Sequence, residues 1–89
     1  MSASLHAKYD RNSDVLYISA KREAAIRGIE DRSGIVWRYG SGGDLIGATI
    51  IDYFDLWREN KSALVKEIAE KFHVDTGYAD ELLKRADSE

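Results

Sequence analysis

The most constraining feature of the sequence lies between Tyr9 and Ala20, where a polar cluster runs directly into a strand pattern. The cluster consists of Asp10, Asn12, Ser13 and Asp14. Short polar side chains of this kind bond to nearby backbone groups and favour a tight turn. Val15 to Ile18 follows at once and contains residues that favour strands. The stretch therefore predicts a hairpin turn that leads into a core strand.

Four further segments have the pattern of strands. Leu5 to Tyr9 alternates apolar and polar residues, as a short first strand does. The other segments are Ala25 to Glu30, with Gly28 as a weak point or bulge, Ile35 to Tyr39, and Leu45 to Ile51. Their connections are too short for crossover helices, so we expect a mostly antiparallel sheet.

After Ile51 the apolar period changes from that of a strand to that of a helix. A first amphipathic helix is indicated by the spacing of Leu64, Ile68 and Phe72, with a start between Asp55 and Asn60, either of which can cap it. A second helix is expected from about Thr76 to Arg85, capped by Asp75 or Thr76. Its buried side is predicted to consist of Ala79, Leu82, Leu83 and Ala86.

The order of these segments predicts an α+β fold. We expect a curled antiparallel sheet of four or five strands, followed by two short C-terminal helices. A chain of 89 residues forms one domain, residues 1–89, with a sheet part over 1–54 and a helical part over 55–89.

Two of the predicted strands are apolar on both faces, Val15 to Ile18 and Leu45 to Ile51. Such a sheet needs a cover on each side. The C-terminal helices can cover one face, and the rest of the chain offers nothing for the other. A second copy of the sheet is the economical cover, so we expect a homodimer.

Composition narrows the classes of function. The formal net charge is -3 and both signs are interspersed, so a diffuse attraction to nucleic acid or to an anionic membrane is not expected. The sequence has no cysteine, which excludes disulfides, thiolate nucleophiles and cysteine-bearing metal sites. We see no signal peptide and no apolar run near the roughly 20 residues that a membrane helix needs. We therefore expect a cytoplasmic protein.

The strongest metal-like pattern fails on inspection. Asp10, Asn12 and Asp14 have the spacing of the first three ligands of a calcium loop. Such a loop has Gly at position six and Glu at position twelve, where this chain has Val15 and Lys21. A structural turn is the better interpretation.

No set of residues identifies a reaction. The two histidines, His6 and His73, cannot complete a zinc site alone. No nucleophile, base and orienting group occur together in the sequence. We therefore expect a protein that is not an enzyme and that holds no metal or cofactor.

Several short motifs together resemble a known family. They are Tyr9-Asp10, Asn12, Asp14, Leu16-Tyr17-Ile18, Gly34-Ile35-Val36, Asp44-Leu45-Ile46-Gly47 and Ile50-Ile51-Asp52. This pattern, over about residues 8–56, resembles the small prokaryotic domain-of-unknown-function family 2283. The resemblance implies a small β-rich domain without assigned activity, suspected in some cases of acting as an antitoxin. The chain departs from the family pattern at Trp37-Arg38-Tyr39, where an acidic and aliphatic strand end is typical. It also adds some thirty residues of helix.

Residues 64–86 offer an alternative function, because their spacing resembles a helix-turn-helix. The turn position usually held by Gly is His73, and acidic residues lie on the exposed face of the second helix at Asp75, Asp80 and Glu81. Carboxylates there would repel the phosphates that dominate DNA affinity. If this pair does read DNA, the contacting residues are expected to be Thr76, Tyr78, Lys84 and Arg85.

The aromatic residues near the end of the sheet suggest a different role. Trp37, Tyr39 and Trp57 are candidates for partner binding if they stay exposed after folding, because large rigid rings anchor protein interfaces. The interpretation we favour is a non-enzymatic protein-interaction or regulatory module, antitoxin-like in its partners. A DNA-binding transcriptional regulator is the alternative.

Overall fold

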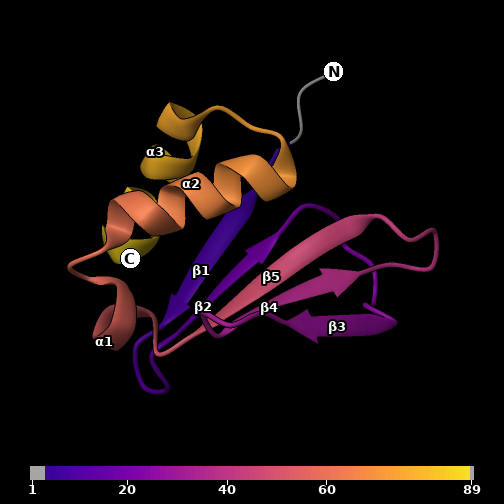
Figure 1. The fold of residues 1–89 in the computed structure, drawn as a ribbon, viewed down its shortest axis with the longest axis horizontal. Helices are drawn as coiled ribbons and strands as arrows, with labels where there is room; N and C mark the ends of the chain where they lie inside the picture. Colours follow the sequence, from indigo (N-terminus) through magenta and orange to yellow (C-terminus); the bar gives the residue numbers. More distant parts are fainter. Residues whose placement is uncertain (1–3, 89) are drawn as a thin grey trace.

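The structure, a computed structural model, describes residues 4–88 and joins five strands to three helices (Figure 1). The strands are β1 (His6–Asp10), β2 (Val15–Ser19), β3 (Arg27–Glu30), β4 (Ile35–Tyr39) and β5 (Leu45–Ile51). The helices are α1 (Tyr53–Trp57), α2 (Lys61–Phe72) and α3 (Thr76–Ser88). The α+β class, with an antiparallel sheet ahead of C-terminal helices, is confirmed.

The strands form one open sheet in the order β1-β2-β5-β4-β3, with every neighbouring pair antiparallel. β5 is the longest strand and lies at the centre, between β2 and β4. Residues Ile46 to Ile50 of this strand are buried, because neighbouring strands on both sides shield its side chains.

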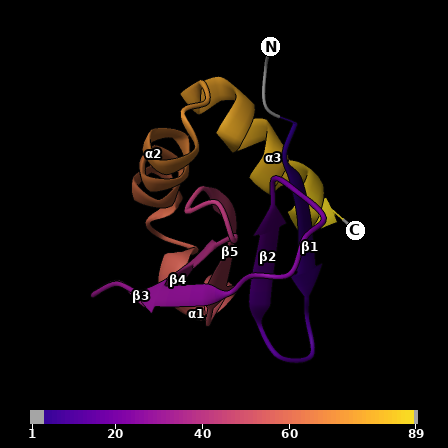
Figure 2. The ribbon, with the colours of Figure 1, turned by 90° about the vertical axis from the view of Figure 1, so that its right-hand side faces the viewer.

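α2 and α3 lie together on one side of the sheet, whereas α1 lies at the end of the strands (Figure 1); α3 lies against β1 (Figure 2). The core forms between them. Its sheet side consists of alternate strand residues, Leu16, Ile18, Ile35, Trp37, Ala48 and Ile50. Its helix side contains Tyr53, Leu64, Ile68, Phe72 and all four predicted buried residues of α3, Ala79, Leu82, Leu83 and Ala86. The buried face of each of the two long helices was therefore correctly predicted from the spacing of its apolar residues.

The helical region differs from the prediction in two ways. A separate helix, α1, precedes the two expected ones, so the helical part begins at Tyr53 and not near residue 55. α3 continues to Ser88, beyond the predicted end at Arg85. The predicted cap at Asp75 is present, since its carboxylate accepts a bond of 3.1 Å from the amide of Gly77. Asn60 occupies the cap position of α2 but makes no side-chain bond there.

The bulge expected at Gly28 is wrong. Gly28 pairs regularly with Arg38, and the register shift lies between Arg38 and Tyr39 in the pairing of β4 with β5. There, Arg38 pairs with Gly47 and Tyr39 pairs with Leu45. The glycine at this irregularity is Gly47, which lies on β5, two strands further in than Gly28.

Gly47 lies where two backbones approach closely. A Cβ at this position would stand 2.8 Å from the carbonyl oxygen of Ile18 on the neighbouring strand. We expect Gly47→Ala to lower the free energy of unfolding by about 2 kcal/mol, because the rigid β2 backbone must move to admit the methyl group. Urea denaturation followed by circular dichroism measures this loss.

Gly42→Ala is the matched control for Gly47→Ala. Its Cβ would meet only the flexible side chain of Asp44, at 3.3 Å. A change within about 0.5 kcal/mol is expected for a surface position of this kind. Equal losses in the two variants would contradict the close approach at Gly47.

Candidate interaction site

No element within residues 4–88 covers the second face of the sheet. Leu16 and Ile18 are buried beneath the helices, so Tyr17 between them points to the opposite side. Directly opposed residues of antiparallel strands share a face, which extends this assignment across all five strands. We call this surface the open face; its main residues are Lys8, Val15, Tyr17, Glu30, Val36, Arg38, Thr49 and Ile51.

The centre of the open face is apolar. Tyr17 is 45% exposed and Ile51 is 42% exposed, with half-buried Val15 and Val36 beside them. The polar residue between these side chains is Thr49, which is buried and accepts a hydrogen bond of 2.8 Å from Arg38 Nε. A solvated sheet face normally carries polar residues at such positions. This centre is therefore suited to contact with another protein surface.

Opposite charges mark the two ends of the open face. A row of paired residues crosses the sheet from Lys8 on β1, through Tyr17, Thr49 and Val36, to Glu30 on β3. Lys8 and Glu30 are exposed, so a cation lies at one sheet edge and an anion at the other. A surface with this polarity favours some orientations of a partner over others.

The turn that the sequence singled out is a structural junction. The carboxylate of Asp14 accepts hydrogen bonds from the Tyr9 hydroxyl at 2.6 Å and from the amides of Phe54 and Asp55 at 2.8 and 3.1 Å. Asp14 thus caps α1 from a distant part of the chain, while its own backbone is left-handed, with φ 57°. This contact explains why a helix begins after β5.

The same contacts shift the pKa values of Asp14 and Tyr9. Partial burial alone would raise the pKa of Asp14, but the bonds from Tyr9 and the two amides outweigh it and lower that pKa below its ordinary value. The hydrogen bond to Asp14 in turn raises the pKa of Tyr9 to about 12. Asp14 therefore acts as a permanently charged structural group near neutral pH.

A second carboxylate organises the turn between β3 and β4. Asp31 accepts bonds from the amides of Ser33 and Ile35 and from the Ser33 hydroxyl. Its other oxygen accepts a bond of 2.9 Å from Trp37 Nε1. Burial opposes ionisation, but these bonds prevail and lower the pKa of Asp31. The carboxylate is fully occupied in holding the turn.

The three predicted partner-binding aromatics lie in or against the core. Trp37 is 2% exposed, with its ring near Phe72 and its N–H bonded to Asp31. Trp57 is also buried, and among residues 4–88 its Nε1 has no hydrogen-bond partner. Tyr39 alone is half-exposed. Of the three, Tyr39 is the one that stays partly exposed after folding, which was the condition for a role in partner binding. Partner binding by Tyr39 stays a prediction.

Sequence reasoning missed the aromatic and aliphatic residues that are exposed. Tyr53 and Trp57 face the core four residues apart, which leaves Phe54 and Leu56 on the outside of α1. α1 has only five residues, too few to show a clear helical period, so no local signal in the sequence marks Phe54 and Leu56. On the open face, the signal for Tyr17 was present in the alternation of β2.

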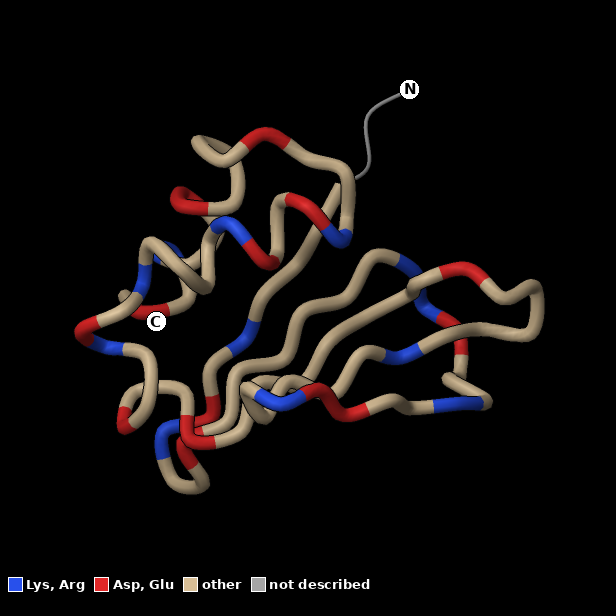
Figure 3. Tube along the Cα trace, viewed as in Figure 1, with Lys and Arg blue, Asp and Glu red and all other residues tan. Residues whose placement is uncertain are grey.

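The predicted DNA-contacting residues are spread along α3, and two of the four are already engaged. Tyr78 accepts a bond of 2.8 Å from the amide of Leu5, which fixes α3 to the start of the sheet. Lys84 forms an ion pair with Asp80 at 3.2 Å. Thr76 and Arg85 are exposed. Acidic and basic residues both occur along α2 and α3 (Figure 3).

Two further findings concern residues 4–88. They contain no group of three or more His, Cys, Asp or Glu residues placed to hold a metal ion. No helix of this part of the chain combines the length and apolar character that crossing a membrane requires.

Comparison with known proteins places the sheet in a family. A family model described as a protein of unknown function, DUF2283, matches residues 6–53. No curated protein and no solved structure matches the chain. The matched segment contains all five strands and Asp14, whereas Phe54 and Asp55, whose amides bond to Asp14, lie just beyond it, as do α2 and α3. The match covers more than half of the chain, and the chain therefore belongs to the DUF2283 family.

Proposed function

We propose that the chain is a non-enzymatic protein-interaction module that works as a homodimer, with the open faces of two copies packed together. The observation that carries this proposal is the apolar centre of the open face, where Tyr17 and Ile51 remain exposed. Packing two such faces would bury these side chains in a layer about 10 Å thick, as in a β-sandwich. The burial of large aromatic and aliphatic side chains drives such association.

The charges at the sheet edges select one arrangement of the two copies. A twofold axis that runs parallel to the strands lays β1 of one copy over β3 of the other. Lys8 of each copy then faces Glu30 of its partner at both ends of the interface. An axis across the strands would instead place like charges opposite one another, which disfavours that arrangement.

The absence of catalysis in this proposal has a physical basis. Asp14 and Asp31 direct their oxygens to backbone amides and to aromatic side chains. Asp87 is held by the Tyr53 hydroxyl and by Lys61. Carboxylates that are engaged in this way stabilise turns and helix contacts. They are poorly placed to transfer protons to a substrate.

The partner that we propose for the dimer is a regulatory or toxin-like protein, as for an antitoxin. Phe54 and Leu56 are exposed on α1, outside the strands that form the open face, and provide apolar surface for such a partner. We place this activity in the cytoplasm, in keeping with a chain that relies on packing without cysteines.

A DNA-binding role for α2 and α3 is the second candidate. The observation in its favour is the tight turn between them, where His73 is left-handed with φ 57° and the amide of Val74 donates to the Ala69 carbonyl at 3.0 Å. The acidic residues of α3 and the engaged Lys84 argue against it.

Light scattering tests the two functions in one measurement. We expect the purified protein to have twice the chain mass of 10.0 kDa and to keep that mass when short duplex DNA is added at low or moderate salt. A monomer would overturn the dimer. A salt-dependent increase in mass with DNA that is lost in Lys84→Ala/Arg85→Ala would overturn the preference for protein partners.

A further inference from the structure

β3 is an exposed edge strand. Within the part of the chain that the structure describes, it pairs with β4 alone, and all four of its residues are exposed. At the end of the β3–β4 pair, the backbone amide of Asp31 donates a hydrogen bond to the carbonyl oxygen of Ile35. In an antiparallel pair, the backbone groups of alternate residues point toward the partner strand. The N–H and C=O groups of Ile29 and Arg27 therefore point toward β4, and those of Gly28 and Glu30 point outward. Outward groups on an edge are a template for another strand.

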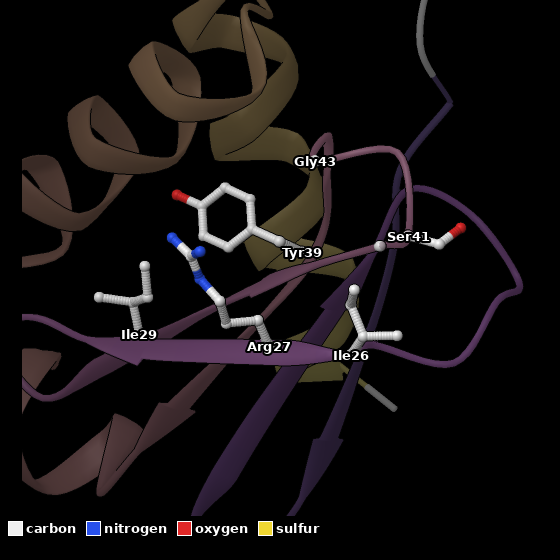
Figure 4. A pocket seen from close by; sticks show the side chains of 7 residues that line it. Ile26, Arg27, Ile29, Tyr39, Ser41 and Gly43 are labelled. Carbon is white, nitrogen blue, oxygen red and sulfur yellow. The ribbon is translucent and has the colours of Figure 1, made fainter.

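A pocket of about 300 Å³ lies beside this edge, on the helix side of the sheet. Figure 4 shows the side chains of Arg27, Ile29 and Tyr39 rising from the sheet around it. Its lining consists of Ile26, Arg27, Ile29, Tyr39, Gly40, Ser41 and Gly43. Ile26 is 70% exposed and Ile29 is 43% exposed, which is unusual for isoleucine. The pocket is therefore apolar on the side next to the free edge.

Arg27 is the charged residue of this lining. Its guanidinium lies over the ring of Tyr39, 6.0 Å from the ring centre, which holds the cation at the pocket. An occupant that supplies a carboxylate at this position complements the charge.

We propose that the free edge of β3 binds an extended peptide segment of a partner protein as a sixth, antiparallel strand. The segment carries an apolar residue opposite Ile29 and an acidic residue two positions later, opposite Arg27. Its backbone bonds to the outward groups of Gly28 and Glu30, as in other cases of strand addition. This inference rests on the proposed interaction function and uses a surface distinct from the apolar centre of the open face.

A second copy of β3 is a poorer occupant than a foreign peptide. Edge-to-edge pairing of two copies needs a carboxylate from the partner to meet Arg27. Asp31 cannot supply it, because its oxygens are bonded to Ser33, Ile35 and Trp37. Glu30 points to the open face, on the opposite side of the sheet from Arg27.

The probe for this site is a fluorescein-labelled, capped heptapeptide, Thr-Val-Thr-Leu-Thr-Asp-Thr. We expect a saturable rise in fluorescence anisotropy with the full-length protein, together with shifts of the Gly28 and Glu30 amide resonances in NMR spectra. The same peptide N-methylated at the two threonines that flank Leu cannot form the edge hydrogen bonds and should not bind. Absence of binding, or equal binding of the N-methylated peptide, would overturn the proposal.

Charge reversal tests the proposed partner chemistry. Arg27→Glu should weaken binding of the Asp peptide about fivefold, and a peptide with Lys in place of Asp should regain that loss. Lys66→Glu, an exposed cation on α2, is the matched control and should leave binding unchanged. Equal weakening by both variants would contradict a specific role of Arg27.

The solution mass of each variant tests the homodimer independently of the peptide site on β3. We expect Arg27→Glu to remain a dimer in light scattering, since its side chain does not lie on the open face. A variant that loses the dimer but keeps peptide binding would overturn the proposed homodimer and leave the β3 site standing. A dimer that dissociates on Arg27→Glu would show that a second copy occupies the edge and would overturn the peptide proposal.

Discussion

Tyr17→Asp is expected to convert the dimer to a monomer, with a dissociation constant at least about a hundredfold higher. Tyr17 lies on β2, next to the central strand, in the cross-strand row of the open face that ends at Lys8 and Glu30. In the proposed dimer its ring is buried between two sheets, and an aspartate there would bury an unpaired charge in each copy. Light scattering over a dilution series measures the change.

Leu56→Asp is the matched control for Tyr17→Asp. Leu56 is 55% exposed on α1, so the substitution makes a comparable change from apolar to acidic on a helix that contributes no residue to the open face. Its mass should stay that of a dimer. Because Tyr17 is already 45% exposed in the single chain, both variants should retain the circular dichroism spectrum of the parent. A dimeric Tyr17→Asp would contradict the use of this face.

Charge exchange across the sheet tests the orientation of the two copies. Lys8→Glu should weaken the dimer by placing a carboxylate opposite Glu30 of the partner copy. The double variant Lys8→Glu/Glu30→Lys restores opposite charges and should recover the dimer. If it recovers nothing, the two copies do not pack about an axis parallel to the strands.

The strands and the long helices were predictable because each has a regular apolar period. The alternation in Ile35 to Tyr39 correctly predicted a strand, and the four-residue spacing of Leu64 and Ile68 correctly predicted the amphipathic helix α2. Such periods depend only on neighbours along the chain, which is why sequence reasoning reached them.

The short helix α1 was not predictable in this way. It has only five residues, too few for a clear period, and its cap comes from Asp14 in a hairpin far earlier in the chain. The same limit applies to the bulge, which depends on how β4 meets β5 at Gly47. These features arise from contacts between segments, and a local pattern does not record them.

The candidate site was only partly predictable for the same reason. β2 and β5 have apolar residues on both faces, which correctly indicated that one face of the sheet is left open by the helices. Alternation along a strand shows which of its residues point to which face. The choice of Trp37 and Trp57 as surface anchors depended on residue type alone. Their burial follows from the packing of α1 and α2 over the sheet, which residue type does not reveal.

Asp14→Ala is expected to lower the free energy of unfolding by about 3 kcal/mol. Loss of the α1 cap contributes about 1.5 kcal/mol, alanine in a left-handed backbone about 1 kcal/mol, and the bond from Tyr9 about 0.5 kcal/mol after screening by solvent. The residue acts through Tyr9, Phe54 and Asp55, so the loss arises from the junction and not from the core. Urea denaturation near neutral pH measures it.

Asp14→Asn separates the charge of this residue from its backbone conformation. Asparagine tolerates the left-handed backbone and keeps one acceptor, so we expect a loss of only about 1 kcal/mol. Folding lowers the pKa of Asp14 below its ordinary value of 3.8, so the stabilisation from its charge is complete above that value and is lost as the pH falls through the lower folded pKa. The gap in stability between the parent and Asp14→Asn should therefore be widest near pH ~7 and should narrow toward pH ~3. A gap that stays constant over this range would mean that the charge of Asp14 does not hold the hairpin to α1.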